Sequence, residues 1–320
     1  MDLSLLLSNL TNPTLLYFIL GILATTIGSD LKIPSSIVKF ISLYLLFAIG
    51  FKGGQELAHS TITVEILLIL LSGVVLASVI PLYSFFILKK RMSPSDAGAV
   101  AAAYGSVSAV TFVAAVTFLE ILEMQFHGHM VAVMALMESP AIIVGVILIK
   151  KFDKENDNEG KMSDIIKHSF TNGSVLMILG SLVIGFIADS KQAEGILPFT
   201  NDIFKGFLAI FLLEMGMLTA RRFAAFRRYG KFAFMMGILF PAVNGTIVAI
   251  LSGFFMTEIS DRFILSVLAA SASYIAVPAA MRIAAPKADP GLYLPMALGV
   301  TFPFNITIGM PLYLWVVNLF

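Results

Sequence analysis

The sequence predicts an all-α protein that crosses a membrane several times. Of its 320 residues, 58% are hydrophobic and 13% are charged, whereas ordinary soluble domains carry about 25% charged residues. Apolar windows of about 20 residues, each long enough to cross a hydrocarbon core of about 30 Å, recur along the chain. One window also returns half a chain later, because Ser106 and Ser108 match Ser271 and Ser273 at an offset of 165 residues (271 − 106). We therefore expect two related halves.

Composition also limits the chemistry and the partners. The chain has no cysteine, which excludes disulfides, thiolate catalysis and cysteine-bound metals. Its net charge of +1 gives no reason to expect a nucleic-acid partner. The N-terminal residues lack the basic region and cleavage site of a secretory signal, so the first apolar segment should remain as a membrane helix. We expect a lipid bilayer around the protein and no cofactor.

Ten helices are expected from the apolar windows. Their spans are 14–30, 34–52, 63–88, 95–119, 129–150, 170–189, 196–219, 231–256, 261–284 and 291–318. The long hydrophilic run falls between the fifth and sixth helices. It divides the chain into a first five-helix repeat (1–150), a linker (151–169) and a second five-helix repeat (170–320).

Lysine and arginine predict the orientation. Sixteen of them fall in alternate loops: Lys32, Lys89, Lys90, Arg91, Lys150, Lys151, Lys154, Lys161, Lys167, Arg221, Arg222, Arg227, Arg228, Lys231, Arg282 and Lys287. The opposite side has Lys52, Lys191 and Arg262. The positive-inside rule makes the sixteen-residue side cytoplasmic and puts both termini outside. Because each repeat has an odd number of crossings, the second repeat must be inverted, and the linker is cytoplasmic.

The matched serines lie in the fourth and ninth expected helices. Both helices have small, polar centres, and we expect them to be broken near Gly105 and near 270–273. The positive N-terminal ends of half-helices at membrane depth attract an anion, and freed carbonyls can ligate sodium. Candidate binding groups are Gly105, Ser106, Ser108, Thr111, Ser271 and Ser273. The alternative is that these small residues serve helix packing, with each serine bonded to its own helix.

Ionisable groups inside the expected spans are further candidates, since they are costly in a membrane. Glu138 precedes Pro140 in the fifth helix and could ligate a cation or a proton, or form a structural hydrogen bond. A sodium ion could therefore be held by Ser108, Thr111, Ser273 and Glu138. Glu214 and Lys52 occupy similar places in the two halves, and a structural ion pair is expected between them.

Two weaker patterns lie at the surface. Glu120, Glu123, His127 and His129 cluster in an outer loop and could bind a metal, but a solvated loop is the expected state because no fourth-ligand pattern is present. Gly105-Ser-Val-Ser lacks the G-x-S-x-G pattern of a nucleophile elbow, and no histidine lies at membrane depth to act as a base. The chain is therefore not expected to be an enzyme.

Several short motifs follow one another along the chain: Ile33-Pro-Ser-Ser, Ile49-Gly-Phe-Lys-Gly-Gly54, Gly105-Ser-Val-Ser-Ala-Val-Thr111, Thr117-Phe-Leu-Glu120, Glu138-Ser-Pro-Ala141, Met215-Gly-Met217 and Ala270-Ser-Ala-Ser, with Pro278, Arg282, Pro286 and Asp289-Pro290. By these motifs the chain resembles the SbtA-type sodium-dependent bicarbonate transporters of cyanobacteria and other bacteria. The resemblance runs from about residue 14 to 318.

This resemblance implies a homotrimer of protomers with a five-plus-five inverted repeat, core and gate domains, and an elevator-like movement. Bicarbonate would lie between the crossing helices, and sodium would drive its uptake across the bacterial inner membrane. The anion and cation contacts would come from Gly105, Ser108, Thr111, Ser271 and Ser273. Cyanobacterial members are also inhibited by a trimeric PII-like protein at the cytoplasmic face.

Three departures from the cyanobacterial pattern stand out. Those relatives read Ser-Ser-Ser-Asp where this chain has Ser271-Ala-Ser-Tyr274, so a carboxylate is missing beside the expected site. They have aspartate at the position of Glu138, which keeps the charge. The linker 151–169 is also much shorter here.

The sequence thus predicts a secondary active transporter that imports a small anion, bicarbonate first, by symport with sodium. A carrier of another small organic anion, coupled to sodium or protons or uncoupled, is the alternative within transport. A non-transporting membrane anion sensor or scaffold is the alternative from another class, although the short tails and linker leave no room for an output domain.

Overall fold

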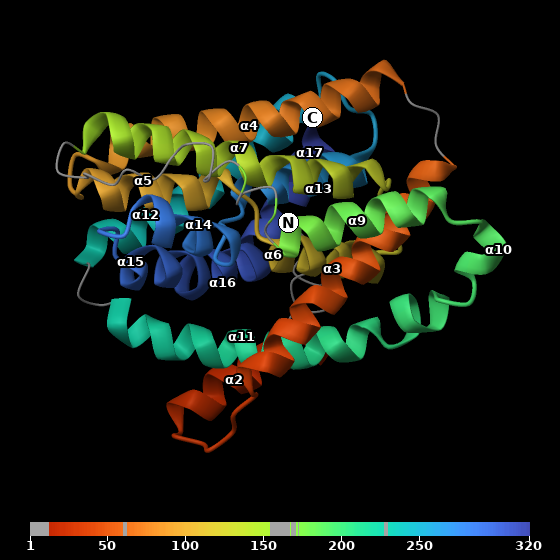
Figure 1. Ribbon diagram of the computed structural model, residues 1–320, viewed down its shortest axis with the longest axis horizontal. Coiled ribbons are helices and arrows are strands. Elements are labelled where there is room, and N and C mark those ends of the chain that lie inside the picture. Colours follow the sequence, from red (N-terminus) through yellow and green to blue (C-terminus); the bar gives the residue numbers. More distant parts are fainter. Residues whose placement is uncertain (1–12, 60–62, 154–166, 168–170, 172, 227–229) are drawn as a thin grey trace.

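The structure, a computed structural model, consists of helices joined by loops over the residues that it describes, which are 13–59, 63–153, 167, 171, 173–226 and 230–320. No strand occurs among these residues (Figure 1). The α-helices are α2 (Pro13–Thr26), α3 (Ser35–Ala58), α4 (Val64–Leu88), α5 (Pro94–Gly105), α6 (Ala109–Ile121), α7 (His129–Phe152), α9 (Gly173–Ile187), α10 (Ser190–Ala193), α11 (Phe204–Phe226), α12 (Gly230–Ser252), α13 (Ile259–Ala270), α14 (Ala276–Ala284), α15 (Pro290–Pro295), α16 (Phe302–Phe304) and α17 (Met310–Leu319). Single π-helical stretches lie at Pro198–Asp202, Met296–Thr301 and Asn305–Gly309.

Helices occupy each of the ten expected segments. Within the described part of the chain, seven helical segments are long and apolar enough to cross a membrane, and two shorter apolar helices lie at Leu16–Thr26 and Gly173–Ile187. The protein is therefore a polytopic α-helical membrane protein, and ten crossings remain a prediction. The second expected helix continues six residues past its predicted end at 52, because α3 ends at Ala58. Most of the expected linker 151–169 lies outside the described residues.

Two helix pairs form one side of the molecule. α2 packs along α11, and α3 packs along α9, so each pair joins one helix from each half of the sequence. In Figure 1, α2 and α11 lie along the lower edge and α3 runs diagonally between them and the remaining helices. The two helices of each pair can approach closely because a glycine of one helix lies against the backbone of the other. A Cβ at Gly21 would lie 2.0 Å from the carbonyl oxygen of Leu213, and a Cβ at Gly54 would lie 2.1 Å from the carbonyl oxygen of Leu182.

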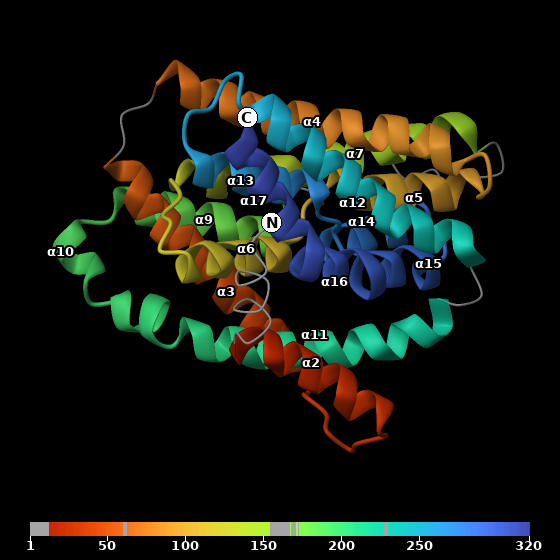
Figure 2. The same ribbon diagram turned by 180° about the vertical axis from the view of Figure 1, so that it is seen from behind.

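The remaining long helices pack as a second group. α4, α5 and α7 contact one another, and α12 packs on α13 and α17 (Figure 2). α5 and α13 lie inside this group, since nearly every residue of each helix is buried. Such complete burial is typical of helices that never face lipid. The two broken helices therefore begin in the most protected part of the protein.

Two matched aspartates bind the N-terminal ends of these inner helices to neighbouring loops. Asp96, in the first turn of α5, accepts a hydrogen bond of 2.8 Å from the backbone N–H of Asp289, just before α15. Asp261, in the first turn of α13, accepts one of 2.8 Å from the backbone N–H of His127, just before α7. The two aspartates are 165 residues apart (261 − 96), the offset of the matched serines. Each thus ties a helix of one half to a loop of the other half.

Candidate functional site

The expected breaks in the fourth and ninth helices are present. α5 ends at Gly105 and α6 begins at Ala109, while α13 ends at Ala270 and α14 begins at Ala276. Ser106 and Ser271, which follow the first half-helices, have nearly the same backbone angles (φ −83°, ψ 169° and φ −82°, ψ 167°). Both entering half-helices are 12 residues long. We call the two breaks together, 106–108 and 271–275, the crossing.

Hydrogen bonds join the two breaks directly. The backbone N–H of Ser273 donates to the carbonyl of Ala103 at 2.8 Å, and the N–H of Ser108 donates to the hydroxyl of Ser271 at 3.0 Å. These bonds pair backbone groups that a broken helix leaves without partners. The structure therefore brings the two serine pairs together, as the sequence predicts.

Asn305, in the last membrane-spanning segment, supports the end of α13. Its side-chain amide donates to the carbonyl of Ala270 at 2.8 Å, and its carbonyl oxygen accepts from the hydroxyl of Tyr313 at 2.9 Å. Asn305 is completely buried. Asn305 is not among the residues predicted for the site, although an asparagine in an apolar span is a signal for such a role.

Four buried hydroxyls at the crossing keep an O–H that can donate to a ligand. Ser106 Oγ and Tyr274 OH have no hydrogen-bond partner among the described residues. Ser108 Oγ accepts from the N–H of Thr111 at 3.1 Å, and Ser273 Oγ accepts from Val277 at 3.5 Å, so their protons remain available. The hydroxyl of Ser271 is already used, since it donates to the carbonyl of Leu268 at 2.8 Å.

The groups at the crossing are therefore suited to an anion. Ser108 caps the N-terminus of α6, where the helix dipole is positive. The Tyr274 hydroxyl lies near the side chain of Ser108, which places it at the same helix end. Neutral O–H donors and a positive helix end favour negative charge without requiring a buried cationic side chain.

Two other residues expected at the site, Gly105 and Glu138, are not among these hydroxyl donors. A Cβ at Gly105 would lie 2.4 Å from Pro81 and 3.1 Å from Ala141, so close packing with α4 and α7 accounts for this glycine. Glu138 is partly buried on α7, one turn before Ala141, and makes no hydrogen bond or ion pair with the residues that the structure describes. Helical periodicity puts Glu138 on the same side of α7 as Ala141, toward the break in α5.

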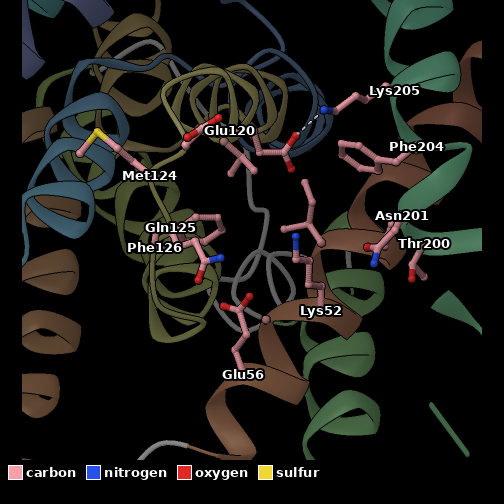
Figure 3. A pocket seen from close by; sticks show the side chains of 15 residues that line it. Lys52, Glu56, Glu120, Met124, Gln125, Phe126, Thr200, Asn201, Phe204 and Lys205 are labelled. Carbon is pink, nitrogen blue, oxygen red and sulfur yellow. Dashed lines mark ion pairs between the residues drawn. The ribbon is translucent and has the colours of Figure 1, made fainter. Parts of the chain in front are cut away.

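A cavity of about 520 Å³ opens between α3, α6 and the beginning of α11. Figure 3 shows Lys52 and Glu56 on α3, with Glu120 of α6 opposite Lys205 of α11. Glu120 and Lys205 form an ion pair of 3.2 Å. The cavity lies at the C-terminal end of α6, the half-helix that begins at the crossing, and by the predicted orientation it faces the outside.

The expected ion pair between Glu214 and Lys52 is absent. Lys52 lines the cavity between α3 and α6, whereas Glu214 is buried on α11 and its Oε2 has no hydrogen-bond partner among the described residues. Lys52 and Glu214 lie on different helices in different surroundings, so their similar places in the two halves of the sequence do not bring them together. The prediction of this pair was wrong.

The outer-loop histidines are also not simply solvated. His129 is 5% exposed, and its Nε2 lies 3.3 Å from Asp261, while His127 Nδ1 lies 2.8 Å from the same carboxylate. Glu120 pairs with Lys205 instead of joining them. No group of three metal-binding side chains is arranged to hold a metal ion in the part of the chain that the structure describes. The expectation of a solvated loop is therefore wrong for His129.

Comparison with known proteins gives the family. A search of curated proteins gave no match. A family model described as "Na+-dependent bicarbonate transporter superfamily" matches residues 13–318, which include both breaks, both inner aspartates and Asn305. The match describes transporters and no enzyme, in agreement with the absence of a nameable catalytic group in the sequence. Because it covers nearly the whole chain, the protein belongs to the Na+-dependent bicarbonate transporter superfamily.

Proposed function

We propose that this protein is a secondary active transporter that imports a small anion, with bicarbonate as the first candidate and sodium as the coupling ion. The crossing is the observation that carries this proposal. It combines four available O–H donors with the N-terminus of α6, all buried among helices that do not face lipid. Bicarbonate presents three oxygens in a plane, so several donors can bind it at once.

The anion contacts are assigned to Ser106, Ser108, Ser273 and Tyr274. Tyr274 replaces the carboxylate of the cyanobacterial relatives with a neutral donor, which suits an anion better than a cation. Thr111 and Ser271 support the site through bonds that orient Ser108. In this arrangement Gly105 acts by allowing the close packing of α5.

The sodium contacts are assigned to Glu138 and to oxygens near the break in α5. Glu138 is the carboxylate that its helix directs toward this break, and carbonyl and hydroxyl oxygens are suitable ligands for a hard cation. If sodium binds here, a charge-neutral substitution at Glu138 reduces sodium activation without removing the O–H donors for the anion.

The proposed architecture is a five-plus-five inverted repeat with a core and a gate. The matched breaks, the matched aspartates and the cross-half helix pairs support the repeat. The pairs α2–α11 and α3–α9 would form the gate, and the group containing the crossing would move past it as an elevator. A homotrimer in a bacterial inner membrane, both termini outside, and a PII-like regulator at the cytoplasmic face complete the proposal; native mass spectrometry tests the trimer.

Uptake of radiolabelled bicarbonate into proteoliposomes at fixed pH tests the function. Uptake that needs an inward sodium gradient, compared with potassium, supports the proposal. Uptake without sodium but with a proton gradient favours the alternative coupling, and competition by small carboxylates favours another organic anion. Binding of bicarbonate with no uptake under any gradient would favour a membrane anion sensor.

A further inference from the structure

The outer-loop histidines and Asp261 form a compact cluster that transport through the crossing does not explain. The buried carboxylate of Asp261 receives three contacts: the backbone N–H of His127 at 2.8 Å, His127 Nδ1 at 2.8 Å and His129 Nε2 at 3.3 Å. The two imidazole rings are stacked, with centroids 5.5 Å apart. One aspartate thus joins the start of α13 to the loop before α7. We call these three residues the histidine clamp.

The equivalent contacts of Asp96, the aspartate that matches Asp261, do not include a histidine. Asp96 accepts from the backbone N–H of Asp289 at 2.8 Å and from the hydroxyl of Ser93 at 2.8 Å. The hydroxyl of Ser93 contacts Asp96 where the imidazole of His127 contacts Asp261. The backbone bond is therefore common to Asp96 and Asp261, whereas the contacts with histidine are made by Asp261.

The histidine clamp also reaches helix α3 of the proposed gate. A Cβ at Gly128 would lie 2.1 Å from the carbonyl oxygen of Gly53 and 3.0 Å from the Cβ of Glu56, so the loop lies directly on α3. Glu56, Glu258, His127, His129 and Asp261 line one cavity of about 700 Å³. Two further lining residues, His59 and Glu65, complete its titratable groups.

The charges around His127 favour its protonated form. Burial lowers the pKa of His127, but the hydrogen bond to Asp261 and the negative charges of Asp261, Glu258 and Glu56 outweigh burial, so the pKa is raised above its ordinary value of 6.5. His127 is 54% exposed, so protons reach it from the cavity.

We propose that the histidine clamp acts as a brake on transport at the outer face. When His127 is protonated, the clamp holds the loop before α7 to both α13 and α3, and uptake is slower. The proposal rests on the transport function proposed above, because a brake needs a movement to oppose. The positive charge of protonated His127 attracts Asp261 on α13, which His127 contacts, and Glu56 on α3, which lines the same cavity. Since the folded pKa is raised, this attraction is complete below the ordinary histidine pKa and is lost as pH rises through the folded value.

Uptake measured from pH 5.5 to 8.5 at constant bicarbonate concentration and constant sodium gradient tests the brake. The wild-type rate should rise about two- to fivefold with pH, the effect of one partly exposed ion pair. His127→Gln keeps a side-chain donor for Asp261 but removes the proton, so its rate should be fast and flat over the same range. Glu56→Gln should move the midpoint of the wild-type profile to lower pH, which a merely structural role for His127 would not do.

His59→Gln is the matched control, because His59 lines the same cavity, and its profile should follow the wild type. A wild-type profile that is flat, or that persists in His127→Gln, would overturn the brake while leaving transport intact. Hydrogen exchange of the peptide covering 122–128 gives a readout independent of uptake: protection should increase at low pH in the wild type alone. No uptake at any pH, with that exchange difference retained, would overturn the transport function and leave the clamp.

Discussion

Replacing Asn305 by alanine tests whether the last membrane helix holds the crossing together. The substitution removes the donor that satisfies the carbonyl of Ala270 at the end of α13. Tyr313 keeps a partner, since its hydroxyl also lies 2.9 Å from the carbonyl of Pro241. One buried acceptor is therefore left unpaired, which costs about 1–3 kcal/mol.

Asn318→Ala is the matched control for this substitution. Asn318 donates a side-chain hydrogen bond of the same 2.8 Å to the carbonyl of Leu314, but within its own helix, and Asn318 itself is exposed. Unfolding in mixed micelles of mild detergent and SDS should show the loss for Asn305→Ala and a change within about 0.5 kcal/mol for Asn318→Ala. Asn305→Ala should also reduce anion uptake in the folded fraction. Equal stability of the two variants would refute the argument that Asn305 supports the break.

Three further substitutions test the site and the packing. Ser108→Ala combined with Ser273→Ala should abolish anion uptake while the protein still assembles. Ser78→Ala is the control and should leave uptake unchanged, because the Ser78 hydroxyl donates to a carbonyl of its own helix. Uptake retained by the double variant would remove the Ser108 and Ser273 hydroxyls from the mechanism. Glu138→Gln should weaken sodium activation more than anion affinity, and unchanged activation would assign Glu138 a structural role. Gly21→Ala should cost about 1–3 kcal/mol by overpacking, because its Cβ would meet backbone at 2.0 Å, and equal stability of Gly21→Ala and Gly206→Ala would refute the close helix contact.

The broken helices were predictable because the sequence marks them twice. A Gly/Ala/Ser centre in an otherwise apolar span is unusual, and its return at a fixed offset predicts two copies in one site. The serines at 106, 108, 271 and 273 do meet across the break. Helix ends were less predictable: α3 runs to Ala58 because Glu56 and its neighbours pack against the loop before α7, and such tertiary contacts are not visible in a hydropathy window.

Contacts between the halves could not be read from the sequence. Asn305, Glu214 and Lys52 are each visible as polar residues in apolar surroundings, but their partners depend on how the helices pack in space. The pairing of His127 and His129 with Asp261 joins positions about 130 residues apart, and no local pattern links them. The repeated Ser-Asp pair at 95–96 and 260–261 can be seen in the sequence. That each aspartate accepts a hydrogen bond from a loop of the other half is apparent only in the folded protein.

The hydroxyls at the crossing are proposed to bind the transported anion. Sodium-driven uptake of radiolabelled bicarbonate should therefore be compared between the wild type and the combined Ser106→Ala and Tyr274→Phe variant, which removes the two buried hydroxyls that lack a partner among the described residues. We expect robust uptake by the wild type and a loss of about five- to 150-fold in the variant, since removing two donors of about 0.5–1.5 kcal/mol each costs about 1–3 kcal/mol in all. Equal uptake by two well-folded proteins would contradict the claim and place the anion elsewhere.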